Sequence, residues 1–180
     1  MGVFRTPIDL KHCIVKMQDG IGGTGANSLT IRVGSGDFTW SEKHPIEYIR
    51  DRGKLDTVRK GEEMPCEVRL NITYVLLTQD GANPAEAITP ADVLHHRNGA
   101  ATWVSSAVDI CEPFAINLSV EYDPACVGVK SEIALFPDFR YESLDYDVKA
   151  GTFNITGKCN ATQPIVTRQA QSTNTAVTDI

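Results

Sequence analysis

Four acidic residues lie close together in the segment PDFRYESLDYDV, and their spacing is the first feature that could support catalysis. They are Asp138, Glu142, Asp145 and Asp147. A pair of carboxyl groups about 5 to 9 Å apart can cleave a glycosidic bond, and clustered carboxylates can bind calcium. However, the segment lacks the ligand spacing of a calcium-binding loop, and aromatic residues interleave with the acids as they do on a strand. We interpret the segment as a solvated acidic edge.

The histidines and cysteines form no recognisable catalytic or metal-binding motif. His95 and His96 are adjacent, so on a helix their side chains point about 100° apart and do not easily share one metal. The five cysteines include no CxxC pair. A bridge between Cys111 and Cys126 stays open, although free and mostly buried thiols fit the pattern better. HExxH, GxSxG and P-loop motifs are also absent from the sequence, so we predict no enzymatic activity, no metal and no cofactor.

Alternation of apolar and polar residues predicts strands through most of the chain. The segments 66–77, 114–122 and 151–162 each place apolar residues at every second position. This period of two is typical of a strand with one buried and one wet face. The polar residues that we expect on the wet faces include Glu67, Asn71, Thr73, Asn117, Ser119, Glu121, Asn154 and Thr156.

One short helix is predicted in the segment ITPADVLHHRNG. Thr89 is suited to the N-cap, Pro90 to the first helical position and Asp92 to the first turn. The basic residues that follow and the Asn98-Gly99 step are typical of a helix end. We therefore expect a mainly β fold, a β-sandwich or partly open barrel with one short flanking α-helix and a long extended arm or hairpin loop.

Length and composition favour a single domain. The chain has 180 residues, of which 42% are hydrophobic, and this is enough for one core. We expect residues 1–164 to form the β domain and residues 165–180, which are rich in Gln, Ser, Thr and Asn, to form a polar C-terminal tail. The net charge of −6 argues against a protein held on DNA by phosphate neutralisation. Without an apolar run of the roughly 20 residues that a membrane span needs, and without a secretory signal, we expect a soluble cytoplasmic protein.

The segment 42–63 is the longest charged stretch, and its six basic and six acidic residues cancel. Five large apolar residues are spread through it, which is unusual for a solvated loop, and it is longer than most connections. We interpret it as an assembly arm with a turn at Asp51-Arg52-Gly53, whose balanced charge suits contact with another copy. The arm residues that we expect in this contact are Tyr48, Ile49, Arg50, Asp51, Arg52, Lys54, Leu55, Asp56 and Arg59.

The order of these elements resembles that of the tail tube proteins of tailed bacteriophages. The similar segments are DFTW, the arm YIRDRGKLDTVRKGEE, the return strand CEVRLNITY, the helix and the closing AGTFNITGKCN. The resemblance covers most of the chain. It implies stacked hexameric rings whose inner wall is a continuous β-barrel, in a virion tail that is assembled in the host cytoplasm. It also implies contacts with other tail proteins, such as sheath, terminator or baseplate hub.

If the chain is a tail tube protein, the polar strand faces that include Glu67, Asn117 and Asn154 contain the lumen lining, and which of these faces lines the lumen stays open. An acidic lumen repels DNA phosphates, so the genome passes without specific binding. The stretch DICEPFAINLSVEYDPACVGVK departs from the simplest members of the family and leaves a contractile or a flexible tail open. The alternative function is a monomeric β-sandwich that binds a carbohydrate or another ligand, with Trp40, Trp103 and Tyr141 as stacking platforms. A hydrolase built on the acidic segment comes third.

Overall fold

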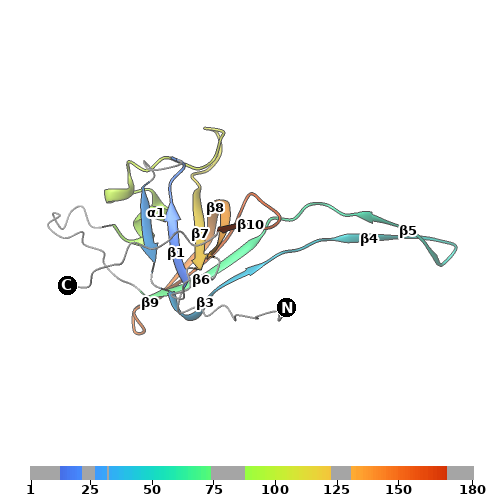
Figure 1. Cartoon of the computed structure of the whole chain (residues 1–180), viewed down its shortest axis with the longest axis horizontal. Helices are drawn as coiled ribbons and strands as arrows, with labels where there is room; N and C mark the ends of the chain where they lie inside the picture. The colour runs from blue at the N-terminus through green and yellow to red at the C-terminus, as the bar shows by residue number, and fades with distance from the viewer. Residues whose placement is uncertain (1–12, 22–26, 32, 74–87, 123–130, 170–180) are drawn as a thin grey trace.

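The computed structural model describes residues 13–21, 27–31, 33–73, 88–122 and 131–169. The fold is mainly β with one short α-helix, as predicted (Figure 1). The strands are β1 (Cys13–Gln18), β2 (Ser28–Ile31), β3 (Val33–Ser41), β4 (Ile46–Asp51), β5 (Lys54–Lys60), β6 (Glu67–Thr73), β7 (Ile116–Tyr122), β8 (Ser131–Asp147), β9 (Thr152–Lys158) and β10 (Ile165–Gln169). The helix α1 spans Pro90–His95, and a 3₁₀ turn follows at Asn98–Ala100.

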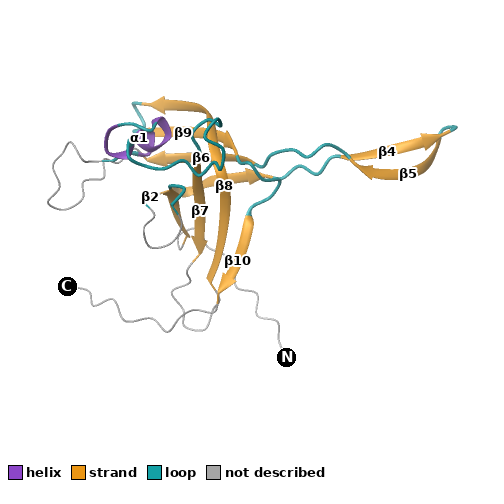
Figure 2. Ribbon diagram, turned by 90° about the horizontal axis from the view of Figure 1, so that it is seen from above, coloured by secondary structure: helices purple, strands orange, loops and turns teal. Residues whose placement is uncertain are grey.

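The main sheet is antiparallel and has the strand order β2-β1-β7-β8-β9-β6-β3, with β10 also paired to β8. The 17-residue strand β8 belongs to both halves of this sheet, because its first part pairs with β7 and β10 and its second part with β9. In Figure 2, β6 and β9 run across the direction of β7 and β10, so the sheet turns at β8. The result is a partly open sandwich around one core.

Both halves of the sheet send their apolar side chains into this single core. The buried residues from β1, β7 and the first part of β8 include Val15, Met17, Leu118 and Phe136. Those from β6 and β9 are Val68, Leu70, Ile72, Phe153 and Ile155. Because the inner faces meet in one cluster, the outer faces of the two halves lie on different sides of the body. Polar residues on the outer face of one half of the sheet therefore do not share a surface with those of the other half.

The strand β10 corrects the predicted domain boundary at residue 164. Ile165 pairs with Leu135 and Gln169 with Ser131, so the first five residues of the expected tail belong to the sheet. Strand β10 joins the sheet through backbone hydrogen bonds at an edge, which requires no alternation of apolar side chains. The rest of that segment, 170–180, lies outside the described residues, as do Tyr74 and Cys126.

Helix α1 begins with the predicted cap. The side chain of Thr89 accepts a hydrogen bond from the backbone N–H of Asp92, and the Asp92 carboxylate accepts one in return from the backbone of Thr89. Arg97 and Asn98 also donate to the same carboxylate, at 3.0 and 2.7 Å. Burial by itself raises the pKa of Asp92, but these hydrogen bonds outweigh it and hold the pKa below its ordinary value. The helix is therefore tied to its flanking turns by one buried carboxylate.

Candidate assembly surface

The arm is a two-stranded hairpin that projects from the body (Figures 1 and 2). Among the described strands, β4 and β5 pair only with each other, and Asp51 lies opposite Lys54 at the tip. The two residues between them, Arg52 and Gly53, have φ values of 47° and 81°. Positive φ at both central residues is the geometry of the two-residue turn that matches the twist of a hairpin. The turn predicted at this position is confirmed.

A β-bulge in β5 brings the large apolar residues of the arm onto one face. Tyr48 lies opposite Val58, and the register then shifts so that Asp56 has no partner. Residues directly opposite each other share a face, so Ile46, Tyr48, Leu55 and Val58 lie together. Without the bulge, the register that begins at the turn would continue along both strands and would place Val58 on the other face.

We call these four residues the apolar arm face. They are 55 to 66% exposed. Two strands alone form no core, and an exposed group of large apolar side chains on a soluble protein usually marks a contact site. The apolar arm face is therefore the candidate assembly surface.

The opposite face of the arm is polar and pairs its charges within the hairpin. Arg59 donates to Glu47 at 2.7 Å, and this hydrogen bond lowers the pKa of the Glu47 carboxyl. Ile49 lies on this face, opposite Thr57. Ile49 and Leu55, which the sequence led us to group together, thus lie on opposite sides of the hairpin.

The two residues of the apolar arm face that we did not predict are Ile46 and Val58. The alternation Ile46-x-Tyr48 signals the contribution of β4, but the contribution of β5 depends on the bulge. Near the tip, Arg50, Arg52 and Lys54 have no ion-pair partner among the described residues. The tip is therefore available to charges on another molecule.

A groove of about 510 Å³ lies where the arm meets the body. Its lining includes Pro45, Ile46 and Val58, so the apolar arm face continues into it. Its other lining residues include Lys43, Lys60 and Gln163. We call this the arm-base groove. It adds a concave surface to the exposed stripe of the hairpin.

Four of the predicted lumen residues lie together on the outer face of β6 and β9. Asn71 lies directly opposite Asn154, and Thr156 opposite Arg69. Glu67, four residues before Asn71 on β6, lies on the same face and forms an ion pair with Lys43 at 2.6 Å. The backbone of Thr73 continues β6, but its side chain is outside the described part. This half of the sheet has the polar face that the sequence predicted.

The three predicted lumen residues on β7 belong to the other half of the sheet. Glu121 forms an ion pair with Lys16 at 2.6 Å, on the outer face formed by β1 and β7. The candidate lumen residues therefore lie on the two different halves of the sheet, and which of these faces lines a lumen stays open. Ser119 is also not on a wet face, because it is buried and its Oγ has no hydrogen-bond partner. Its short side chain lies between the longer Lys16 and Leu135 in the register.

The acidic segment is the second part of β8 and its turn, and its carboxylates contact a lysine and backbone groups of the same sheet. Glu142 forms an ion pair with Lys158 at 2.6 Å, and Asp145 lies opposite Asn154 on the sheet. Asp147 accepts backbone hydrogen bonds from the following turn. Asp138 lies at an irregular point of β8, with a φ of 50°. These carboxylates support the strand and its turn.

Other reactive groups give no site either. Burial raises the pKa of Cys159 to about 12, so this thiol stays protonated and unreactive at neutral pH. No three His, Cys, Asp or Glu side chains are grouped to bind a metal in the part of the chain that the structure describes. Trp103 is buried, which removes one of the three aromatic platforms expected for carbohydrate binding. None of the described helices is long and apolar enough to cross a membrane.

No protein-family model, curated protein or solved structure significantly matches the chain. In the described part of the chain, the arm and the outer face of β6 and β9 are organised surfaces without a partner.

Proposed function

We propose that the protein is a structural subunit that assembles with further copies of itself and performs no chemistry. The observation that supports this proposal is the apolar arm face, whose four large side chains are each more than half exposed. A hairpin with two strands cannot bury these side chains by itself. Another copy of the chain would bury them, because the arm is an extension long enough to reach beyond its own body (Figure 1).

The assembly that fits best is the tail tube of a tailed bacteriophage, built of stacked hexameric rings. Support comes from the order of sequence elements, from the net charge of −6 and from the polar outer face of β6 and β9. In such a tube this face lines the lumen, and the net negative charge of the chain disfavours binding of DNA phosphates. The protein then belongs to the virion tail, after assembly in the host cytoplasm, and contacts further tail proteins at the ends or outside of the tube.

The first experiment removes the arm. Tyr48–Val58 is deleted and replaced by a short Gly-Ser turn, and the protein is examined by negative-stain microscopy and light scattering. We expect a folded monomer and no tubes, because the body keeps its core while the apolar arm face is lost. Wild-type protein that stays monomeric at high concentration, or arm-deleted protein that builds normal tubes, would contradict the proposal.

A matched pair of variants separates the two faces of the arm. The triple variant Tyr48→Ser, Leu55→Ser and Val58→Ser should abolish assembly, because it removes apolar contact area and leaves the hairpin in place. The control Ile49→Ser makes the same kind of change on the opposite face and should assemble like the wild type. Equal loss in both variants would contradict a contact made by the apolar arm face.

A further inference from the structure

Two cysteines meet where the arm joins the sheet. Cys66 is the residue before β6, and Cys159 is the residue after β9. Their neighbours Glu67 and Lys158 lie directly opposite each other in the register of these two strands. The backbone N–H of Cys159 donates to the carbonyl of Cys66 at 3.0 Å, so the pairing continues for one more residue. Cys66 and Cys159 are therefore cross-strand neighbours.

Both thiols lie on the inner face of the sheet. Along β6, Cys66 is in phase with the buried Val68 and Leu70, and along β9, Cys159 is in phase with the buried Ile155. Cys66 and Cys159 are 0% and 2% exposed. Facing residues of an antiparallel pair have Cα atoms about 4.5 to 5.5 Å apart, which is within the roughly 4.4 to 6.8 Å that a disulfide spans. The backbone therefore allows a disulfide between them.

Burial makes both thiols slow to react. It raises the pKa of Cys159 to about 12, and the neighbouring Cys66 adds to this rise. Burial also raises the pKa of Cys66. The thiolate is the form that attacks a disulfide, so neither cysteine reacts quickly while the core is closed. Oxidation of the pair therefore requires an opening of this part of the chain.

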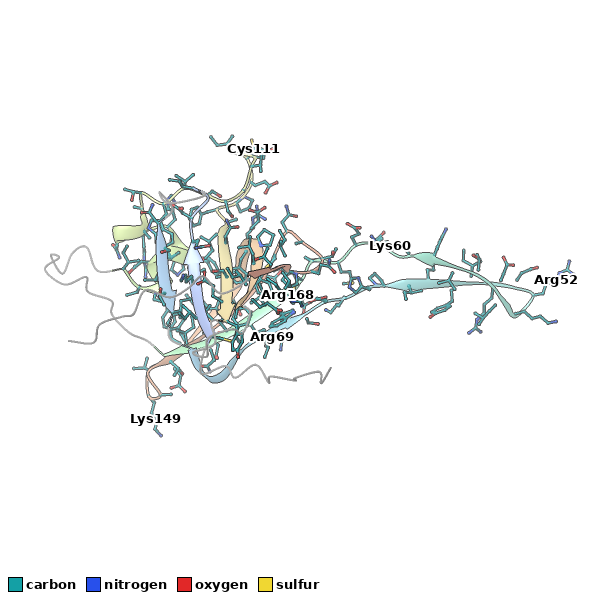
Figure 3. The ribbon with its side chains drawn as sticks, in the orientation of Figure 1. Arg52, Lys60, Arg69, Cys111, Lys149 and Arg168 are labelled. Carbon is teal, nitrogen blue, oxygen red and sulfur yellow. The ribbon has the colours of Figure 1, made fainter. Side chains whose placement is uncertain are left out.

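Two short connections lie beside the pair. Residues 61–65 lead from the arm to Cys66, and residues 160–164 lead from Cys159 to β10. Lys60 marks the end of the arm at this junction in Figure 3. A cavity of about 540 Å³ is lined by residues of both connections and by Cys159. Movement of either connection therefore brings a small oxidant to the thiols from this cavity.

We propose that Cys66 and Cys159 are a redox pair, which is reduced in a reducing compartment and becomes a disulfide in oxidising surroundings. The oxidant is a low-molecular-weight disulfide such as oxidised glutathione. One protein thiolate attacks a sulfur of the oxidant and releases one glutathione thiolate, and the second protein thiolate then displaces the other glutathione from the mixed disulfide. Two protein thiols are thus oxidised to one disulfide. The oxidant is reduced to two glutathione thiols, which take up the two protons.

The disulfide ties the base of the arm to the strand pair β6–β9. It closes the long loop between positions 66 and 159, and a cross-link that closes a long loop restricts the unfolded chain strongly. It also fixes the connections on either side of it, so the arm leaves the body from a more rigid base. This inference goes beyond the proposed self-assembly and does not depend on it.

The first test oxidises the folded protein. The purified protein is incubated with oxidised glutathione, with and without urea below the unfolding transition, and linked peptides are mapped by mass spectrometry. We expect a bond between positions 66 and 159 within single chains, formed faster in urea, because urea favours the open form that exposes the thiols. Both thiols remaining free under all these conditions, or bonding to other cysteines instead, would overturn the redox pair.

The second test measures what the bond does to the fold. The urea midpoint of the oxidised protein should exceed that of the same protein reduced with a phosphine, and Cys66→Ala or Cys159→Ala should abolish this difference. Cys111→Ser is the matched control and should keep the full difference, because Cys111 is exposed and marks the tip of a loop that points away from the body (Figure 3). An oxidised protein that is no more stable than the reduced one overturns the inference. Neither test measures assembly, so the proposed function stands or falls separately.

Discussion

Strands β5 and β6 have the same length of seven residues but opposite surroundings. In β6, Val68, Leu70 and Ile72 are at most 2% exposed. In β5, Leu55 and Val58 are 66% and 56% exposed. Strand β6 lies between β3 and β9 over the core, whereas β4 is the only described strand that pairs with β5. A hydrophobic pattern thus specifies a face, and the packing around the strand decides whether that face is covered.

The body and the arm should therefore respond differently to mutation. Apolar side chains in the body stabilise the monomer, because they leave water when the chain folds. The same side chains on the arm leave water only when another molecule covers them. Stability of the monomer and assembly are thus separable properties, and the following variants test this separation from the largest expected effect to the smallest.

Phe153→Ala should have the largest effect on stability. The side chain is fully buried between the two halves of the sheet, and large-to-small changes at such positions cost about 3 to 5 kcal/mol. Tyr48→Ala removes a comparable aromatic side chain from the arm and should change the free energy of unfolding by less than about 0.5 kcal/mol. Urea denaturation of the two variants measures the difference. Similar losses would show that the arm packs on its own body in solution.

The elements that could be predicted are those whose local sequence is self-sufficient. The alternation in β6, β7 and β9 reflects one buried face, and the cap of α1 is set by Thr89, Pro90 and Asp92. The hairpin of the arm follows from a turn that only a few residue types adopt. In each case, neighbours in the sequence contain all the information that the structure uses.

The features that could not be predicted depend on residues far apart in the chain. Strand β10 has two apolar residues followed by three polar ones, without alternation, and is recognised only through its pairing with β8. Ser119 is buried, and its neighbours in the sheet register, Lys16 and Leu135, are both distant in sequence. The apolar arm face required knowledge of the bulge at Asp56, which shifts the register by one residue. Alternation within one strand contains no information about how that strand is aligned with its neighbour in the sheet.

Gly157→Ala should have an intermediate effect, in contrast with Gly53→Ala on the arm. A Cβ at Gly157 would lie 2.3 Å from the carbonyl oxygen of Arg140 and 2.7 Å from the ring of Phe139. The backbone of β8 cannot move without disturbing the core, so we expect a loss of about 1 to 3 kcal/mol.

At Gly53 a Cβ meets no atom within 4 Å, although the φ of 81° disfavours other residues. The strain there falls on the hairpin turn alone, so the urea midpoint of the body should stay unchanged. A midpoint that falls as far in Gly53→Ala as in Gly157→Ala would show that folding of the arm and of the body is coupled.

Two carboxylates with lowered pKa values extend the comparison to pH. Asp92 is buried and accepts hydrogen bonds from Thr89, Arg97 and Asn98, whereas Glu47 is exposed and is held mainly by Arg59. A carboxyl whose pKa is lower in the folded state stabilises the fold above its unfolded pKa, near 3.8 for aspartate. That stability is lost as the pH falls through the lower folded value. The contribution of Glu47 is screened by water and salt.

Among the body variants Phe153→Ala, Gly157→Ala and Asp92→Asn, the last should lower the stability least. Its distinguishing property is how its stability depends on pH. At neutral pH it should lower the free energy of unfolding by about 1 kcal/mol, because the charge-assisted bonds that hold the start and end of α1 are weakened. Between about pH 5 and pH 2 the wild type should lose stability more steeply than the variant, because only the wild type must protonate this carboxylate. Glu47→Gln should follow the wild-type curve throughout. Urea denaturation of the three proteins at each pH measures this, and an equally steep loss in Asp92→Asn would assign the acid sensitivity to other carboxylates.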